Sequence, residues 1–238
     1  MGVKSEHALP ENLAKEGEEE NLRLGSVDLL VMQILQGVYE GRYVPGQKLI
    51  EGDLTRTYGL GRGTVREALR RLEVEGLVDK DLHRGARIRF FGRDEVRDIL
   101  EINEHLMAMA VIWAAQRHGS SHDLDKLHAI IAAMSHRIDE GDMFGLSRLR
   151  FDYMRELVKL GKNKEMTHYL PRYDATIIRT QFRAVFNRAT ASEDLDAYRE
   201  IARLILARDA EGAARVARKY VRSWSVNVQR LPDHYFAH

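Results

Sequence analysis

The sequence predicts a mostly α-helical protein, in which a small N-terminal domain of mixed α and β structure precedes an all-helical antiparallel bundle of about six helices. Three observations support this fold class. Apolar residues recur at helical spacing over most of the 238 residues, only four prolines interrupt them, and short strand-like runs occur only before residue 92. With 44% apolar and 31% charged residues, the composition is that of a globular chain and not of a disordered one.

Composition also excludes several classes of protein. The chain has no cysteine, which rules out disulfides, thiolate zinc sites and cysteine nucleophiles and fits a reducing compartment. No run approaches the roughly 20 apolar residues of a membrane span. The acidic start lacks the apolar core of a signal peptide. We therefore expect no membrane contact and a cytoplasmic location.

The net charge of +1 hides an uneven distribution of charge. Residues 1–25 hold six glutamates against three basic residues, which predicts a disordered acidic tail. Residues 56–93 hold ten basic residues against five acidic ones. A basic patch on a small domain is typical of phosphate binding, although arginines paired with glutamates on a solvated helix face would give the same composition.

The first folded segment predicts three helices and a hairpin. Helices are expected over residues 26–40, 52–58 and 62–75, with glycines at their ends. Short apolar runs on both sides of residues 81–85 predict a two-stranded hairpin.

The second and third of these helices show a pattern typical of DNA binding. Two short helices joined by a glycine turn predict a helix-turn-helix, and the hairpin behind them would be its wing. Three arginines lie four residues apart on one face of the third helix: Arg62, Arg66 and Arg70. Apolar residues occupy the other face: Val65, Leu69 and Leu72. One face would therefore pack while the other presents guanidinium groups to guanine edges or phosphates.

This ordered pattern strongly resembles the winged-helix domain of the GntR family of bacterial transcription regulators. The matching positions are Gly41, Pro45, Gly46, Leu49, Glu51, Arg62, 65–72, 75–78 and 84–86. The resemblance implies that six residues face DNA: Arg62, Thr64, Arg66, Arg70, Arg84 and Gly85. Gly61 stands where the family usually has serine, which removes a phosphate contact and a helix N-cap.

Beyond residue 92 the strand signals stop and six helical patterns follow. They cover residues 94–118, a helix that starts at Ser121, and then 142–160, 163–188, 193–208 and 210–230. Pro171 is expected to kink or shorten the fourth. We therefore expect a DNA-binding domain over residues 26–91, a helical domain over 93–230 and a short C-terminal tail over 231–238.

The helical part resembles the FCD-type C-terminal domain of the FadR subfamily. That domain binds a small organic acid and commonly holds a divalent metal with one aspartate and three histidines. By this resemblance, two of the ligand positions fall beside Phe151, at Arg148 and Asp152, and the other two fall eleven residues before and after Asp209, at Tyr198 and Tyr220. The pocket arginine and glutamate of the family fall at Asn103 and Met107. A guanidinium, a carboxylate and two phenols do not suit a divalent cation, so the comparison implies an effector site of these six residues without a metal or other cofactor.

Two interpretations of these replaced ligands stay open. Arg148 either forms an ion pair with Asp152, four residues further on, or binds the carboxylate of the effector together with the hydroxyls of Tyr198 and Tyr220. The two tyrosines also lie on inward faces of their helices, where an aromatic side chain most often serves packing.

Together these patterns predict a transcriptional regulator, by family analogy a repressor. It would bind a pseudo-palindromic operator in double-stranded DNA as a homodimer, with its operator affinity controlled by a small organic-acid effector. The alternative is a winged-helix protein that has lost metal-dependent ligand sensing. An enzyme is not expected, because no nucleophile–base pair is visible and the glycines at 59, 61 and 63 precede a recognition helix without the strand pattern of a dinucleotide site.

Overall fold

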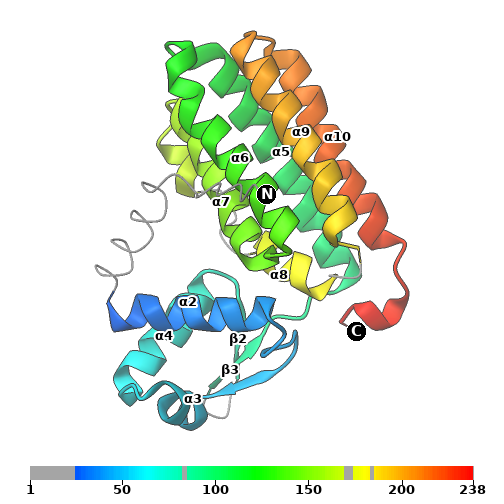
Figure 1. Cartoon of the computed structure of the whole chain (residues 1–238). Helices are drawn as coiled ribbons and strands as arrows, with labels where there is room; N and C mark the ends of the chain where they lie inside the picture. Colours follow the sequence, from blue (N-terminus) through cyan, green and yellow to red (C-terminus); the bar gives the residue numbers. More distant parts are fainter. Residues whose placement is uncertain (1–24, 82–84, 169–173, 183–184, 238) are drawn as a thin grey trace, which may run out of the picture.

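The computed structural model describes residues 25–81, 85–168, 174–182 and 185–237. Figure 1 shows a small domain that contains the described strands and a larger bundle of helices above it. The predicted acidic tail, residues 1–25, lies outside the described residues except for Gly25. Within the described ranges, every helix is too short or too polar to cross a membrane.

The small domain is a winged helix-turn-helix. It contains α2 (Ser26–Tyr39), β1 (Lys48–Ile50), α3 (Glu51–Tyr58), α4 (Arg62–Val74), β2 (Val78–Asp81) and β3 (Gly85–Ile88). The strands form an antiparallel sheet in the order β1-β3-β2. Leu30 and Ile34 of α2 are buried with Val65 and Leu72 of α4, so the apolar stripes predicted for these two helices form the core.

The sheet has one strand more than the sequence predicts. β1 is only three residues long, and Leu49 is its single buried side chain. Such a segment shows no alternation of buried and exposed residues that a sequence pattern could reveal. It is recognised as a strand only through its pairing with β3.

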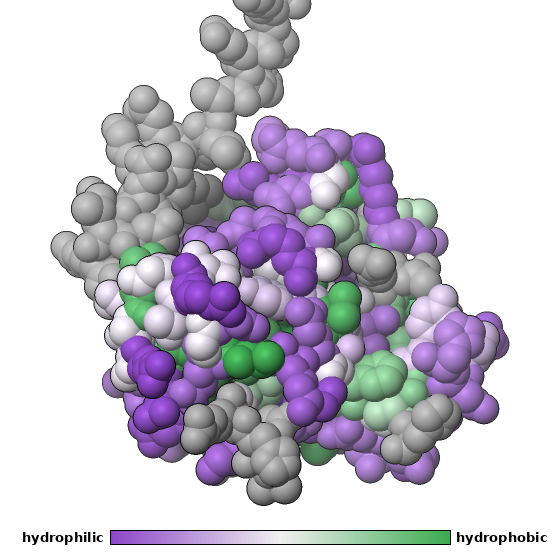
Figure 2. Space-filling view, turned by 90° about the horizontal axis from the view of Figure 1, so that it is seen from below, coloured by the Kyte–Doolittle hydropathy of each residue, from purple (hydrophilic) through white to green (hydrophobic). Residues whose placement is uncertain are grey.

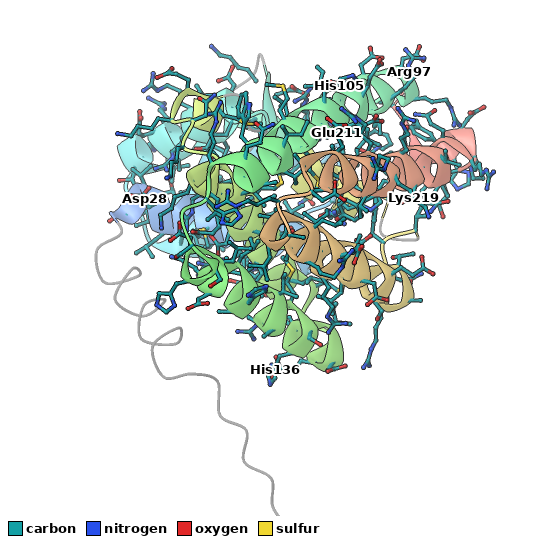
Figure 3. All side chains as sticks on the ribbon, turned by 90° about the horizontal axis from the view of Figure 1, so that it is seen from above. Asp28, Arg97, His105, His136, Glu211 and Lys219 are labelled. Carbon is teal, nitrogen blue, oxygen red and sulfur yellow. The ribbon has the colours of Figure 1, made fainter. Side chains whose placement is uncertain are left out.

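The helical domain consists of six α-helices in the described part of the chain. They are α5 (Arg93–Arg117), α6 (Asp125–Glu140), α7 (Met143–Leu160), α8 (Asp174–Gln181), α9 (Arg188–Leu206) and α10 (Ala210–Gln229), with 3-10 turns at Ser121–Leu124, Glu165–His168 and Asp233–Tyr235. The long helix α5 packs along α10 and also contacts α7 and α9, and α6 packs against α7 and α9. Seen from above, His105 of α5 and Lys219 of α10 project from the outside of this bundle (Figure 3). The predicted mostly α-helical fold is confirmed.

The helix predicted over residues 163–188 is wrong, because the structure divides this segment. Glu165–His168 forms a 3-10 turn, and α8 covers only Asp174–Gln181. Pro171, predicted to kink this helix, lies outside the described residues. The next helix begins at Arg188, earlier than the predicted residue 193, because the side chain of Asn187 accepts hydrogen bonds from the amides of Ala189 and Thr190 and caps it.

The chain passes from one domain to the other at residues 91–93, and the C-terminal segment returns to the same place (Figure 1). Phe236 is buried there, and the Ala237 amide donates to the Phe91 carbonyl at 3.0 Å. The segment after α10 is therefore packed against the junction between the domains.

Candidate DNA-binding surface and a buried polar cluster

Helix α4 presents its arginines on one face because its apolar residues are buried on the other. Arg62, Arg66 and Arg70 are exposed, and Thr64 beside them is half-buried. The turn before the helix contains Gly59 at a φ of 64°, a left-handed conformation that favours glycine. The structure therefore brings these four predicted residues together on one exposed surface.

Two of these arginines have acidic partners. Arg66 Nε donates to Glu51 Oε2 at 2.8 Å, and Arg70 donates to both carboxylate oxygens of Glu67 at 3.1 and 3.2 Å. The hydrogen bonds between them lower the pKa of Glu67 and raise the pKa of Arg70. The side chains of Arg66 and Arg70 nevertheless remain 64% and 71% exposed. Because water screens such surface pairs, they orient the guanidinium groups without preventing contact with a nucleic acid.

The wing is described only in part. Arg84 lies outside the described residues. Gly85 begins β3, and a Cβ at this position would lie 2.3 Å from the carbonyl oxygen of Leu49. Gly85 therefore has a packing reason to be glycine that does not involve DNA. Viewed from below, the surface is largely hydrophilic with separate hydrophobic patches, a character that suits contact with a charged polymer (Figure 2).

A second candidate site is buried in the helical domain, where charged and hydroxyl groups meet from four helices. We call it the buried polar cluster. It consists of Arg150 and Tyr153 of α7, Arg179 of α8, Asp194 and Tyr198 of α9, and Tyr220 and Trp224 of α10. All seven side chains are buried.

Asp194 lies at the centre of the buried polar cluster. Its Oδ2 accepts a hydrogen bond from Arg150 Nη2 at 2.8 Å and lies 3.5 Å from Arg179 Nη1. Its Oδ1 accepts from Trp224 Nε1 at 3.1 Å. Arg179 Nη2 donates to the Tyr220 hydroxyl at 3.2 Å, and the Arg179 guanidinium lies 3.3 Å from the centroid of the Trp224 ring. One carboxylate therefore serves two guanidinium groups.

Three tyrosines extend the cluster as a row of rings in tilted and edge-to-face contact. The hydroxyls of Tyr198 and Tyr220 hydrogen-bond to each other, and the Tyr153 hydroxyl donates to the Tyr198 carbonyl at 3.3 Å. The ring centroid of Tyr198 lies 4.6 Å from that of Tyr153 and 5.1 Å from that of Tyr220. Burial raises the pKa of Tyr153 and the pKa of Tyr220 well above the ordinary tyrosine value, so both hydroxyls are neutral.

Among the described side chains, the two arginines of the buried polar cluster share a single carboxylate, that of Asp194. Burial, and then the neighbouring Arg150, lower the pKa of Arg179, although a guanidinium stays protonated in proteins. Arg179 Nη1 has no hydrogen-bond partner among the described residues and only the Asp194 carboxylate within ion-pair distance. A buried cation with an open donor favours a small anion as a further partner.

The structure brings Tyr198 and Tyr220 together but places Arg148 and Asp152 elsewhere. Arg148 is exposed, and Asp152 is half-buried and accepts a hydrogen bond from Arg155 at 2.9 Å. The expectation that these two residues share a site with the tyrosines is wrong.

The inward residues of α7 had a signal in the sequence. Leu146, Arg150, Tyr153 and Leu157 are buried at the helical spacing i, i+4, i+7 and i+11. The family motif that places Arg148 and Asp152 contains Phe151, whose side chain is 38% exposed. A stripe drawn through the two leucines would have selected Arg150 and Tyr153.

Asn103 and Met107, the other two predicted pocket residues, lie on α5. Met107 belongs to the hydrophobic core and Asn103 is half-buried. Helix α5 contributes none of the seven residues of the buried polar cluster.

The residues of the buried polar cluster do not fit a divalent metal. They offer neutral phenols and one carboxylate that two guanidinium groups already engage, whereas such an ion prefers imidazoles and several free carboxylates. Across the described ranges, no three histidine, cysteine, aspartate or glutamate side chains gather in a way that would hold a metal ion.

The fold and the two sites are those of a DNA-binding protein with a second, sensory domain. A winged helix-turn-helix domain carries an exposed arginine surface, and the helical domain joined to it contains the buried polar cluster. Comparison with known proteins identifies the family. Residues 27–88 match the family described as "Bacterial regulatory proteins, gntR family", and residues 98–223, more than half of the chain, match the FCD domain. The chain therefore belongs to the GntR family of bacterial regulatory proteins, in the branch with a C-terminal FCD domain.

Two relatives agree with this assignment, and two solved structures share the fold. The HTH-type transcriptional repressor GlaR of Escherichia coli (strain K12) is 27% identical over 201 residues, which cover 77% of this chain and 87% of the relative. A probable D-xylose utilization operon transcriptional repressor of Paenarthrobacter nicotinovorans is 24% identical over 139 residues, 58% of this chain and 59% of the relative. The structure of E. coli McbR/YncC superimposes with a TM-score of 0.72 at 18% identity, over 87% of this chain and 97% of that one. A putative GntR regulator from Rhodococcus sp. RHA1 gives a TM-score of 0.70 at 17% identity, over 85% and 96%.

Proposed function

We propose that this protein is a transcriptional repressor whose affinity for its operator is controlled by a small organic acid bound in the helical domain. Family membership supports DNA binding, and the names of the two relatives support repression as the sign of regulation. The observation that carries the effector part of the proposal is the buried Arg179, which has an open donor beside a carboxylate shared with Arg150.

The buried polar cluster indicates the class of effector. The cluster holds one more guanidinium than carboxylate, so a monocarboxylate would neutralise it. Its polar groups are surrounded by the rings of Tyr198, Tyr220, Trp224 and Phe186, which favours an acid with a flat or apolar body. The guanidinium of Arg179 supplies the charge that a metal would otherwise supply, and we propose that the site works without a metal.

The remaining parts of the proposal follow from the DNA-binding domain. We propose a homodimer in which two copies of α4 read a pseudo-palindromic site, with Arg62, Thr64, Arg66, Arg70, Arg84 and Gly85 facing the DNA. The protein would act in the cytoplasm and would have no catalytic role.

A second candidate is a DNA-binding regulator that no longer senses a ligand. The mutual hydrogen bonds within the buried polar cluster favour it, because Tyr198, Tyr220 and Asp194 already satisfy one another or their neighbours. In that case the cluster would serve only the stability of the helical domain.

The test begins with selection of duplexes from a random-sequence pool by the purified protein. We expect enrichment of a two-fold symmetric sequence, tight binding in fluorescence anisotropy, and loss of binding in Arg66→Ala. Benzoate, acetate and pyruvate are then added to the complex, with sodium chloride at equal ionic strength as the control. Release by a carboxylate supports the effector proposal. Unaffected binding at saturating concentrations of all carboxylates would favour the second candidate, and no enrichment of any sequence would contradict the DNA-binding proposal.

A further inference from the structure

We infer that α8 couples the buried polar cluster to the junction between the two domains, with Gln181 as the positioning residue. The inference rests on the proposed function and adds to it the route by which the two sites communicate. Two side chains of this short helix, those of Arg179 and Gln181, contact different parts of the molecule.

The side chains of Arg179 and Gln181 project from opposite sides of α8. Each residue of an α-helix turns by about 100° around the axis. The side chains at positions i and i+2 therefore point in nearly opposite directions. Arg179 enters the buried polar cluster, where it contacts Tyr220, Trp224 and Asp194. Gln181 reaches the junction. Figure 1 shows α8 at the level where the helical bundle meets the winged-helix domain.

The amide group of Gln181 holds the backbone of the junction directly. Its Oε1 accepts from the Phe91 amide at 2.9 Å, and its Nε2 donates to the Phe91 carbonyl and to the Tyr235 carbonyl, each at 2.9 Å. Both backbone groups of Phe91 are thus bound by one buried side chain. A buried polar group that loses its partners is costly, so the backbone of Phe91 and Gln181 are expected to move together.

The C-terminal segment also packs against the junction between the domains. The Phe236 ring lies 5.0 Å from the ring of Phe182, the residue that follows Gln181, and the Ala237 amide donates to the Phe91 carbonyl. Arg93 donates to the carbonyl of Gln229 at 2.6 Å and to that of Leu231 at 2.8 Å. The first residues of the helical domain are therefore fixed to the end of α10, while Phe91 is fixed to α8 and the C-terminal segment.

These contacts connect an event at Arg179 to the position of the DNA-binding domain. An anion that binds Arg179 would draw its guanidinium away from Asp194 or Tyr220, and α8 is only eight residues long. Movement of α8 would carry Gln181, and with it Phe91, the last residue but one before α5 begins at Arg93. Coupling between two sites is reciprocal, so binding of DNA must also change the contacts within the buried polar cluster.

Reciprocity allows a test that needs no knowledge of the effector. The chain has two tryptophans, Trp113 and Trp224, so Trp113→Phe leaves Trp224 as the only reporter, inside the cluster. In this background we add the duplex selected by the protein and follow the emission of Trp224, with binding measured separately by anisotropy. The inference predicts a change in emission on binding that is lost in Gln181→Ala, although that variant still binds the duplex.

Gln229→Ala is the matched control. Gln229 Nε2 also donates to the backbone of the junction, at 3.0 Å from the Arg93 carbonyl, but the residue lies at the end of α10 and not on α8. This variant should keep the response of Trp224. If Gln181→Ala does not fold, Gln181→Glu replaces it, because it keeps the acceptor for the Phe91 amide and loses the donor to the two carbonyls.

The outcomes separate the inference from the proposed function. A response of Trp224 that is lost in the Gln181 variant and kept in the Gln229 variant supports the inference. An equal response in both variants, loss in both, or no response in the parent protein with DNA bound would overturn it. Failure of the parent to bind any selected duplex would instead contradict the proposed function, from which the inference starts.

Discussion

The two domains use arginine in opposite ways. On α4 the guanidinium groups of Arg66 and Arg70 are exposed and held by nearby glutamates. In the helical domain the guanidinium groups of Arg150 and Arg179 are buried around one aspartate. An exposed arginine remains available to a large partner such as DNA, whereas a buried one is accessible only to something small enough to enter the helical domain.

This difference also separates effects on binding from effects on stability. Exposed ion pairs are screened by water and contribute little to folding, so removing Arg66 or Arg70 should affect DNA binding alone. Breaking a buried pair leaves an uncompensated charge in the interior, so changes in the buried polar cluster should first affect folding.

The largest effect is expected for Asp194→Asn. This substitution leaves two buried guanidinium groups without their shared carboxylate, and breaking a buried pair in this way costs about 3–5 kcal/mol. The free energy of unfolding in urea measures it. Asp196→Asn is the control, because Asp196 lies on the same helix but pairs with Arg199 at the surface, and it should leave the stability unchanged. Equal losses in the two variants would contradict the assignment of Asp194 to a buried charge centre.

Arg66→Ala should weaken binding to the selected duplex by about tenfold or more, because an arginine contact to a guanine edge contributes on the order of 1–3 kcal/mol. The melting temperature should stay the same. Anisotropy at fixed salt concentration measures the affinity. Arg199→Ala removes an exposed, paired arginine from the helical domain and should leave the affinity unchanged. Full binding by the Arg66 variant would show that α4 is not the reading helix.

Stability should fall at alkaline pH, and Tyr220 should contribute to the fall. Burial raises the pKa of Tyr220 in the folded protein, so the folded state favours the neutral hydroxyl. Its contribution is fully present below the ordinary tyrosine pKa of about 10 and is lost above it by about 1.4 kcal/mol per pH unit until the raised pKa is reached, because the unfolded chain ionises first. Urea unfolding between about pH 9 and 11 should show a shallower decline in Tyr220→Phe than in the parent. Identical declines would place this hydroxyl in contact with water.

Gly61→Ser should raise the stability by a few tenths of a kcal/mol, as serine is a better N-cap than glycine. Gly61 precedes α4 without a side-chain cap, whereas Asp209 caps α10 by accepting a hydrogen bond from the Gly212 amide. No atom lies within 4 Å of a Cβ at residue 61, so the serine fits. Affinity for the selected duplex should also rise, through a phosphate contact at the start of the helix. A fall in affinity would mean that DNA approaches the backbone here too closely for a side chain.

The smallest effect is expected for Arg148→Ala. Arg148 is exposed on α7, and substitutions at such positions change stability by less than about 0.5 kcal/mol. Arg150→Ala, two residues further on, removes a partner of Asp194 and should be far more destabilising. Thermal unfolding of the two variants compares them directly, and the reverse order would restore Arg148 to the effector site.

The DNA-binding domain could be predicted from the sequence because its signals are local. Arginines four residues apart opposite buried Val65 and Leu72 define a helix with one packed and one exposed face, whatever surrounds it. The third strand was missed for the opposite reason: Lys48–Ile50 becomes a strand only by pairing with residues more than thirty positions away.

The buried polar cluster could be predicted only in part, since it depends on four helices meeting. Tyr198 and Tyr220 are indicated by the family resemblance, because they lie eleven residues before and after Asp209, at two histidine positions of the family. Arg179 was not selected, because an arginine on a helix is most often solvated and nothing in its neighbourhood shows that it is buried against Trp224. On α7 the buried Leu146 and Leu157 set the inward face, and Arg148 does not lie on it.

We propose that the helical domain binds a carboxylate through Arg179 and without a metal. The most direct measurement is the shift in melting temperature of chelator-treated protein with benzoate, acetate and pyruvate, with and without added zinc, in the parent and in Arg179→Gln. Binding to the folded state alone raises the melting temperature. We expect a metal-independent rise with at least one carboxylate, and we expect this rise to disappear in Arg179→Gln. A rise that requires zinc, or one that survives unchanged in the Arg179 variant, would contradict it.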